Sequence, residues 1–131
     1  MRPDIRGLRE FYGTRLGKYV RARIAHMAIE RWPDTKGDTM LGLGYATPVI
    51  RFFLRRSGPE GAVIAAMPRG QGALYWPARA DNRTAIVHKH ELPFAPNAIH
   101  RAVLMHALEF AVDPEAVVKE LWRVLTPGGR A

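Results

Sequence analysis

Apolar positions in the first quarter of the chain recur at the spacing of an α-helix. Between residues 5 and 32 they lie three or four positions apart, at Leu8, Tyr12, Leu16, Val20, Ile24 and Ala28. This spacing places the side chains on one face of a helix. Gly13 and Gly17 weaken the first half, because each glycine costs a helix about 1 kcal/mol relative to alanine. We therefore predict the firm part of this helix over residues 14–31.

Shorter apolar runs follow residue 38, and their length indicates strands. The runs cover residues 39–44, 61–67 and 83–88, and glycine, proline or polar residues bound them. Short apolar runs with such boundaries are typical of strands buried on both faces. Residues 99–105 form a fourth run of this kind, for which a helix is the alternative interpretation.

Two further helices are indicated between and after these runs. Residues 49–54 give one apolar helix face, and Gly58 ends it. Asp113, Pro114 and Glu115 form a helix start, with a capping carboxylate, a proline at the first position and an acid in the first turn. The alternation of strands and helices predicts an α/β fold with a mostly parallel sheet.

The first strand candidate leads directly into a glycine turn and a helix start. Gly42 and Gly44 form the turn, Thr47 can cap the helix, and Pro48 suits its first position. This arrangement directs backbone N–H groups and the positive end of a helix dipole at one point. Proteins with α/β folds hold the anionic part of a nucleotide or a nucleotide-like cofactor in this way.

Three segments resemble, in order and spacing, the class I S-adenosylmethionine-dependent methyltransferases of the small-molecule type 11 kind. The first is the glycine turn at residues 42–48. The second is the Leu-Pro-Phe loop at residues 92–94, which is followed after the next strand by His-Ala-Leu-Glu at residues 106–109. The third is Arg-Val-Leu-Thr-Pro-Gly-Gly at residues 123–129. The resemblance covers residues 39–131, and its second half is the more specific part.

The resemblance implies a Rossmann-like, mostly parallel sheet with strand order 3-2-1-4 and an N-terminal helix. It divides the chain into a helical segment, residues 1–38, and part of a methyltransferase-like domain, residues 39–131, that ends before the fifth strand. The fourth strand would then be an apolar edge, which is an aggregation hazard. Either the chain is a fragment of a longer protein, or a second copy of the chain or another protein covers that edge.

The resemblance also implies S-adenosylmethionine as cofactor and a set of residues that bind it. These are Gly42, Leu43, Gly44, Tyr45, Ala46, His88, Lys89 and His106. The turn over residues 43–47 would hold the amino-acid end, and residues 88–92 would lie near the adenine. No catalytic residue is assigned, because methyl transfer depends mainly on an in-line approach in a shaped apolar pocket.

The charged anchors of the family are missing from this sequence. Gly42 stands where the family has an acid before its glycines, and Met67 and Pro68 end the second strand without a carboxylate for the ribose. His88 replaces the aspartate that meets the adenine amine. Each lost hydrogen-bonded anchor costs about 1–3 kcal/mol of binding. We therefore expect a methyltransferase acting on a small molecule, with a catalytically inactive binding or scaffolding protein as the alternative.

The charge of the chain adds a third, weaker interpretation. The net charge is +8, from 20 lysines and arginines against 12 acidic residues, which raises the prospect of an anionic partner. The basic residues are mostly arginines spread along the chain, and we interpret them mainly as solvated faces. A basic RNA-associated protein, or a surface for acidic lipid, would use the arginines between residues 15 and 31, so nucleic acid is the less favoured partner.

Composition excludes several other classes of protein. No apolar run approaches the roughly 20 residues that a membrane span needs. The absence of cysteine excludes disulfides and thiolate metal sites, and it fits a cytoplasmic protein. His88 and His90 lie two apart, as ligands on one side of a strand would, but a third ligand is not evident. We expect no metal site.

Overall fold

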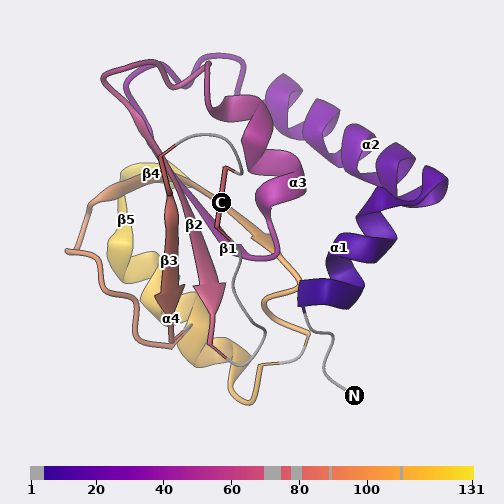
Figure 1. The fold of residues 1–131 in the computed structure, drawn as a ribbon. Helices are drawn as coiled ribbons and strands as arrows, with labels where there is room; N and C mark the ends of the chain where they lie inside the picture. Colours follow the sequence, from indigo (N-terminus) through magenta and orange to yellow (C-terminus); the bar gives the residue numbers. More distant parts are fainter. Residues whose placement is uncertain (1–4, 70–74, 78–80, 89, 110) are drawn as a thin grey trace.

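The computed structural model describes residues 5–69, 75–77, 81–88, 90–109 and 111–131 (Figure 1). Their elements, in chain order, are α1 (Ile5–Gly13), α2 (Arg15–Arg31), β1 (Thr39–Gly44), α3 (Thr47–Ile50), the 3-10 turn η1 (Arg51–Phe53), β2 (Ala62–Pro68), β3 (Thr84–Val87), β4 (Ile99–Met105), α4 (Pro114–Val124) and β5 (Leu125–Arg130). None of the helices in these ranges combines the length and the apolar character needed to cross a bilayer.

The strands form one parallel sheet with the order β3-β2-β1-β4-β5. β1 is the central strand, and Gly42 lies opposite Ala65 of β2 and Val103 of β4. The predicted α/β class, the parallel sheet and the order 3-2-1-4 are confirmed. Residues 99–105 form a strand rather than the alternative helix.

A fifth strand extends the sheet beyond the order that the sequence predicted. We expected residues 126–129 to form a turn and the domain to end before a fifth strand, but residues 125–130 pair with β4. The pairing joins only Ile99 to Leu125 and Arg101 to Arg130, with a register shift between them. Proline and two glycines normally signal a turn, so this irregular strand could not be read from the residues alone. The division at residue 38 stays a prediction.

Helices cover both faces of the sheet, with α1, α2 and α3 on one face and α4 on the other (Figure 1). Successive β1 residues alternate between the two cores: Met40 packs in the cluster with α1–α3, and Leu41 and Leu43 pack in the cluster with α4. Gly42 lies on the first face, where a Cβ would be 2.6 Å from Ile50 Cδ1. Glycine at this position therefore lets α3 pack closely on β1.

The N-terminal segment is two helices, with a break between them at Thr14. The Thr14 side chain caps α2 by accepting a 3.0 Å hydrogen bond from the Gly17 amide, which confirms a firm helix over residues 14–31. Gly17 is buried under the end of α1, since a Cβ there would be 1.9 Å from the Phe11 carbonyl oxygen. Leu16 was predicted on the buried stripe, but it is 64% exposed because the break turns α2 relative to α1.

The helix after β1 is shorter than predicted. Instead of one helix to about residue 56, the chain forms the four-residue α3 and the single turn η1. Ala46, rather than Thr47, is the N-cap residue, and no side chain caps the helix. A helix this short has few aligned peptide dipoles, so the predicted dipole at this turn is weak.

Candidate functional site

The turn after β1 lies at the edge of the sheet where the parallel strands β1 and β4 end together. Gly44 has φ +91°, and a Cβ there would be 2.1 Å from the Met105 carbonyl oxygen. The Tyr45 amide donates a 2.8 Å hydrogen bond to the same oxygen. Only glycine fits this bend, which holds the end of β1 against the end of β4. Open parallel sheets bind their ligands at this edge.

The turn joins a strand to a helix as predicted, but it is covered. Residues 43–47 are all buried, and Thr47 is the most exposed of their side chains at 8%. The Tyr45 amide is already bonded to Met105, so it does not contribute to the predicted cradle of free amides. A ligand can reach this turn only after the cover moves.

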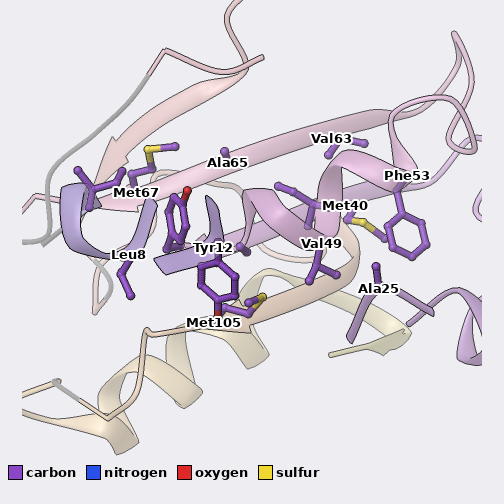
Figure 2. Packing of buried hydrophobic residues seen from close by; sticks show 14 of the residues in the cluster. Leu8, Tyr12, Ala25, Met40, Val49, Phe53, Val63, Ala65, Met67 and Met105 are labelled. Carbon is purple, nitrogen blue, oxygen red and sulfur yellow. The ribbon is translucent and has the colours of Figure 1, made fainter. Parts of the chain in front are cut away.

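Tyr12 of α1 provides much of that cover. Its ring lies 5.8 Å from the rings of both Tyr45 and His106, measured between centroids, and its hydroxyl is 2.8 Å from His106 Nε2. Figure 2 shows Tyr12 in the same buried cluster as Met105 and Met67. The sequence placed Tyr12 only on an apolar stripe. The only sign of these contacts in the sequence was the hydroxyl of Tyr12, because a buried tyrosine hydroxyl usually has a hydrogen-bond partner.

His106 connects Tyr12 to an acid. It follows β4 in the left-handed region, at φ 56°, and its Nδ1 is 3.8 Å from Glu109 Oε2. Burial raises the pKa of the Tyr12 phenol, and the charges of Tyr45 and Glu109 raise it further. The phenol is therefore protonated at neutral pH, and its hydroxyl forms the hydrogen bond with Nε2, with the donor set by the imidazole tautomer.

Two arginines contribute positive potential at Tyr45, while Glu109 contributes negative potential at the neighbouring Tyr12. Burial raises the pKa of Tyr45, while the hydrogen bond with Thr47 and the charges of Arg9 and Arg21 act in the opposite direction. Arg9 comes from α1 and Arg21 from α2, so the N-terminal helices supply the positive charge. Such a potential suits a carboxylate or another anion at this edge of the sheet.

A clamp between α4 and the Leu-Pro-Phe loop explains two of the resembling motifs. Arg123 donates 2.9 Å hydrogen bonds to the carbonyl oxygens of Leu92 and Phe94. Glu120 accepts from the Leu92 amide at 2.7 Å and from Arg123 Nε at 3.0 Å. Both motifs therefore act together to fix the loop before β4, a role that the sequence did not indicate.

The predicted site residues fall into two groups. Gly42, Leu43, Gly44, Tyr45 and Ala46 are contiguous at the end of β1, and His106 joins them through Tyr12. His88 lies after β3, separated from β1 by β2, in an isolated bridge with Glu91. Lys89 lies outside the described residues. Within the described ranges, no three His, Asp or Glu side chains gather to hold a metal ion.

The residues present fit an S-adenosylmethionine-like ligand in backbone shape but not in charged anchors. The bend at Gly44 is kept, but β2 ends in the buried residues Met67 and Pro68, where the family places a carboxylate. A Cβ at position 42 would lie 2.6 Å from Ile50 Cδ1 and 2.9 Å from Ala46 Cβ, so an acid there would require Ile50 and α3 to shift. The close packing of α3 on Gly42 therefore explains why the acid that precedes the glycines of the family motif is missing here.

Comparison with known proteins agrees with this arrangement. A family model described as a methyltransferase domain matches residues 59–131, which is more than half of the chain. No curated protein matches the chain. Among solved structures, a putative S-adenosylmethionine-dependent methyltransferase from Methanococcus maripaludis has 19% identity and a TM-score of 0.68, with 96% of this chain and 61% of that chain covered.

Two further structures share the fold. A SAM-dependent methyltransferase from Aquifex aeolicus has 15% identity and a TM-score of 0.58, with 79% of this chain and 58% of that chain covered. A structure of the complex between the Haloferax volcanii Trm112 methyltransferase activator and a putative methyltransferase also matches. The identity is 26% and the TM-score is 0.61, with 80% of this chain and 48% of that chain covered. This chain thus spans about 60% or less of the length of these three.

The part of the chain that the family model matches forms most of the sheet. Residues 59–131 include β2, β3, β4, α4 and β5, and together with β1 they give the order found in the similar structures. S-adenosylmethionine is the cofactor of these proteins by their own descriptions. With the family model matched over most of this sheet, the chain belongs to the class I S-adenosylmethionine-dependent methyltransferase family.

Proposed function

We propose that this chain is the cofactor-binding portion of an S-adenosylmethionine-dependent methyltransferase that acts on a small molecule. The observation that carries the proposal is the bend at Gly44, which brings the ends of β1 and β4 together in a chain of this family. The cofactor supplies a methyl group already activated on a sulfonium. The residues around the bend would then bind and orient it, and would keep water out.

Each part of the proposed site has a separate role. The turn over residues 43–47 takes the amino-acid end of the cofactor, and Arg9 and Arg21 provide positive potential for its carboxylate. Residues 88–92 lie toward the adenine end. The clamp of Arg123 and Glu120 holds the end of that segment at Leu92.

Tyr12 must leave its present position before the cofactor reaches the turn. It contacts Tyr45 and His106, and it belongs to α1, which α2 follows after the break at Thr14. The break makes α1 a separate element that can move while α2 stays packed. We propose that cofactor entry is coupled to displacement of α1.

Calorimetric titration of the 131-residue chain with S-adenosylhomocysteine tests the proposal without turnover. We expect saturable binding to one site, and stronger binding in Tyr12→Ala, which removes the covering ring. Arg31→Ala, an exposed change at the far end of α2, serves as the control. An absence of heat in both the wild type and folded Tyr12→Ala would overturn the proposal.

A catalytically inactive binding protein is the second candidate, and the covered turn and missing anchors favour it. Met67→Glu would restore a carboxylate at the end of β2, with Met67→Gln as the matched polar control. If only the anchor was lost, Met67→Glu binds S-adenosylhomocysteine more tightly than Met67→Gln. Equal absence of binding in both variants, with native circular dichroism, supports the inactive protein.

The β4 edge, for which the sequence predicted a partner, is instead covered by β5. We propose that a partner covers the opposite end of the sheet. β3 is the terminal strand on one side, it has only four residues, and its Ile86 is 63% exposed. A terminal strand with an exposed apolar side chain can pair with another chain. Association of the Haloferax methyltransferase with its activator is consistent with a partner protein, and sedimentation equilibrium distinguishes it from a second copy.

A further inference from the structure

The positive charge of the molecule is concentrated in one layer. Residues 5–56 contain eleven lysines and arginines against four acidic residues, whereas residues 57–131 contain eight against seven. The first group includes α1, α2 and α3, which lie together on the face of the sheet opposite α4 (Figure 1). Ten of these eleven basic residues lie in α1, α2, η1 and residues 54–56, which together with α3 are called the basic helical layer here.

The longest helix of this layer also exposes large apolar side chains. On α2, Leu16 is 64% exposed, Tyr19 65% and Met27 61%. With Arg23 between them, these positions follow the 3-4-4 spacing that keeps residues on one helix face. The fully buried residues of α2 are Gly17 and Ala25, and Val20 and Ile24 are partly buried against the core beside the stripe. The side chains of Leu16, Tyr19 and Met27 lie outside the buried core.

Basic side chains flank the outward stripe. Arg15, Lys18 and Arg31 are exposed on α2, alongside Arg23. The acidic residues of α1 and α2 are Glu10 and Glu30, and Glu30 is paired with His26 at 3.0 Å near the end of the helix. Apolar side chains surrounded by arginine and lysine are typical of helices that lie in the plane of a membrane surface.

We infer that the basic helical layer docks on the surface of an anionic phospholipid bilayer. In this arrangement Leu16, Tyr19 and Met27 enter the headgroup region, and the basic side chains face lipid phosphates. Near the start of α2, an open hollow lined by Arg6, Arg9, Glu10, Gly13 and Thr14 presents two guanidinium groups. Guanidinium groups bind phosphate oxygens in a bidentate manner, so this hollow suits a headgroup.

Charge and side-chain type favour a bilayer over other occupants. A second copy of the chain would bring two strongly positive layers together, and like charges oppose that contact. RNA would be attracted by the arginines, but it offers no apolar region for Leu16 and Met27. An anionic bilayer complements both features. The inference shares Arg9 with the proposed cofactor site but otherwise uses different residues, and it holds whether or not the chain transfers methyl groups.

Vesicle sedimentation of the whole chain tests the inference. The probes are vesicles of phosphatidylcholine alone and vesicles containing about 30% phosphatidylserine, in about 0.1 M NaCl. We expect binding to the anionic vesicles and none to the neutral ones. Replacing Arg15, Lys18 and Arg23 by glutamine should weaken binding about fivefold per charge removed.

The apolar stripe needs its own variant. A triple variant with Leu16→Ser, Tyr19→Ser and Met27→Ser keeps every charge and alters only exposed positions, so it should fold normally and lose at least about tenfold in vesicle binding. Val118→Ser with Trp122→Ser is the matched control, because both side chains are exposed on α4, on the other face. That control should bind vesicles like the wild type.

Two outcomes would overturn the inference. One is unchanged vesicle binding in the folded triple serine variant, because the stripe would then take no part in docking. The other is an absence of vesicle binding combined with salt-dependent binding of a single-stranded RNA that the serine variant retains. That result would assign the layer to nucleic acid rather than lipid.

Discussion

Gly44 is a position where the backbone itself requires glycine. Alanine would be forced into φ +91° with its Cβ 2.1 Å from the Met105 carbonyl oxygen, so β1 and β4 would have to separate at their ends. We expect Gly44→Ala to lower the free energy of unfolding by about 2–4 kcal/mol, measured by urea titration. Gly13→Ala is the control, because nothing lies within 4 Å of a Cβ there, and it should change stability by about 1 kcal/mol or less. Equal effects of the two changes would contradict this account.

Glu120 should make part of the stability dependent on pH. Its hydrogen bond with Arg123 holds the pKa of Glu120 below its ordinary value of 4.5, with a smaller contribution from the Leu92 amide. Since the pKa is lower in the folded state, the stabilisation is complete well above pH 4.5 and is lost as the pH falls through the lowered pKa. Glu120→Gln should cost about 1–2 kcal/mol at pH 7 and little in strong acid.

Urea unfolding from pH 7 to pH 3 measures this difference. Glu60→Gln, an exposed loop change, provides the comparison, and its profile should follow the wild type. A Glu120→Gln profile parallel to that of the wild type over the whole range would show that the clamp does not depend on the carboxylate charge.

At the scale of elements, α1 is the cover of the candidate site. Tyr12→Ala and Leu8→Ala should both loosen α1, since both side chains are buried in its contact with the core. We expect each to increase amide hydrogen exchange at residues 43–47, with Tyr12→Ala giving the larger change because Tyr12 contacts Tyr45 directly. The exposed change Lys18→Ala should leave exchange unaltered. Protection at residues 43–47 that is insensitive to both core changes would exclude α1 as the cover.

The elements that the sequence predicted well are those determined by their own residues. β1 and β4, the extent of α2 and the start of α4 at Asp113 agree with the apolar runs and with the capping residue Asp113. The short α3 and the strand β5 depend on neighbours instead. α3 packs tightly against Gly42, and β5 forms only where β4 offers partners to residues 125–130.

The candidate site was less predictable than the fold. The turn at Gly44 followed from the sequence and the place of His106 from the resemblance. The hydrogen bond of Tyr12 and the charges of Arg9 and Arg21, however, come from helices more than twenty residues away from the turn. No local pattern reports such contacts. His88 was placed by resemblance alone, and its role at the adenine end stays a prediction.

At the scale of the whole molecule, uneven charge should limit stability at low ionic strength. Residues 5–56 contain eleven basic residues and only four acidic ones, so the basic side chains across α1, α2 and α3 repel one another. Raising NaCl from about 20 to about 200 mM shortens the screening distance to below 10 Å, so the melting temperature should rise by a few degrees. Arg55→Glu with Arg56→Glu, both exposed beyond η1, should raise the low-salt melting temperature and reduce the effect of salt. Lys119→Glu with Arg130→Glu makes the same charge change within residues 57–131, where basic and acidic residues are nearly balanced, and should not. A melting temperature that falls with salt in the wild type would mean that attractive ion pairs outweigh this repulsion.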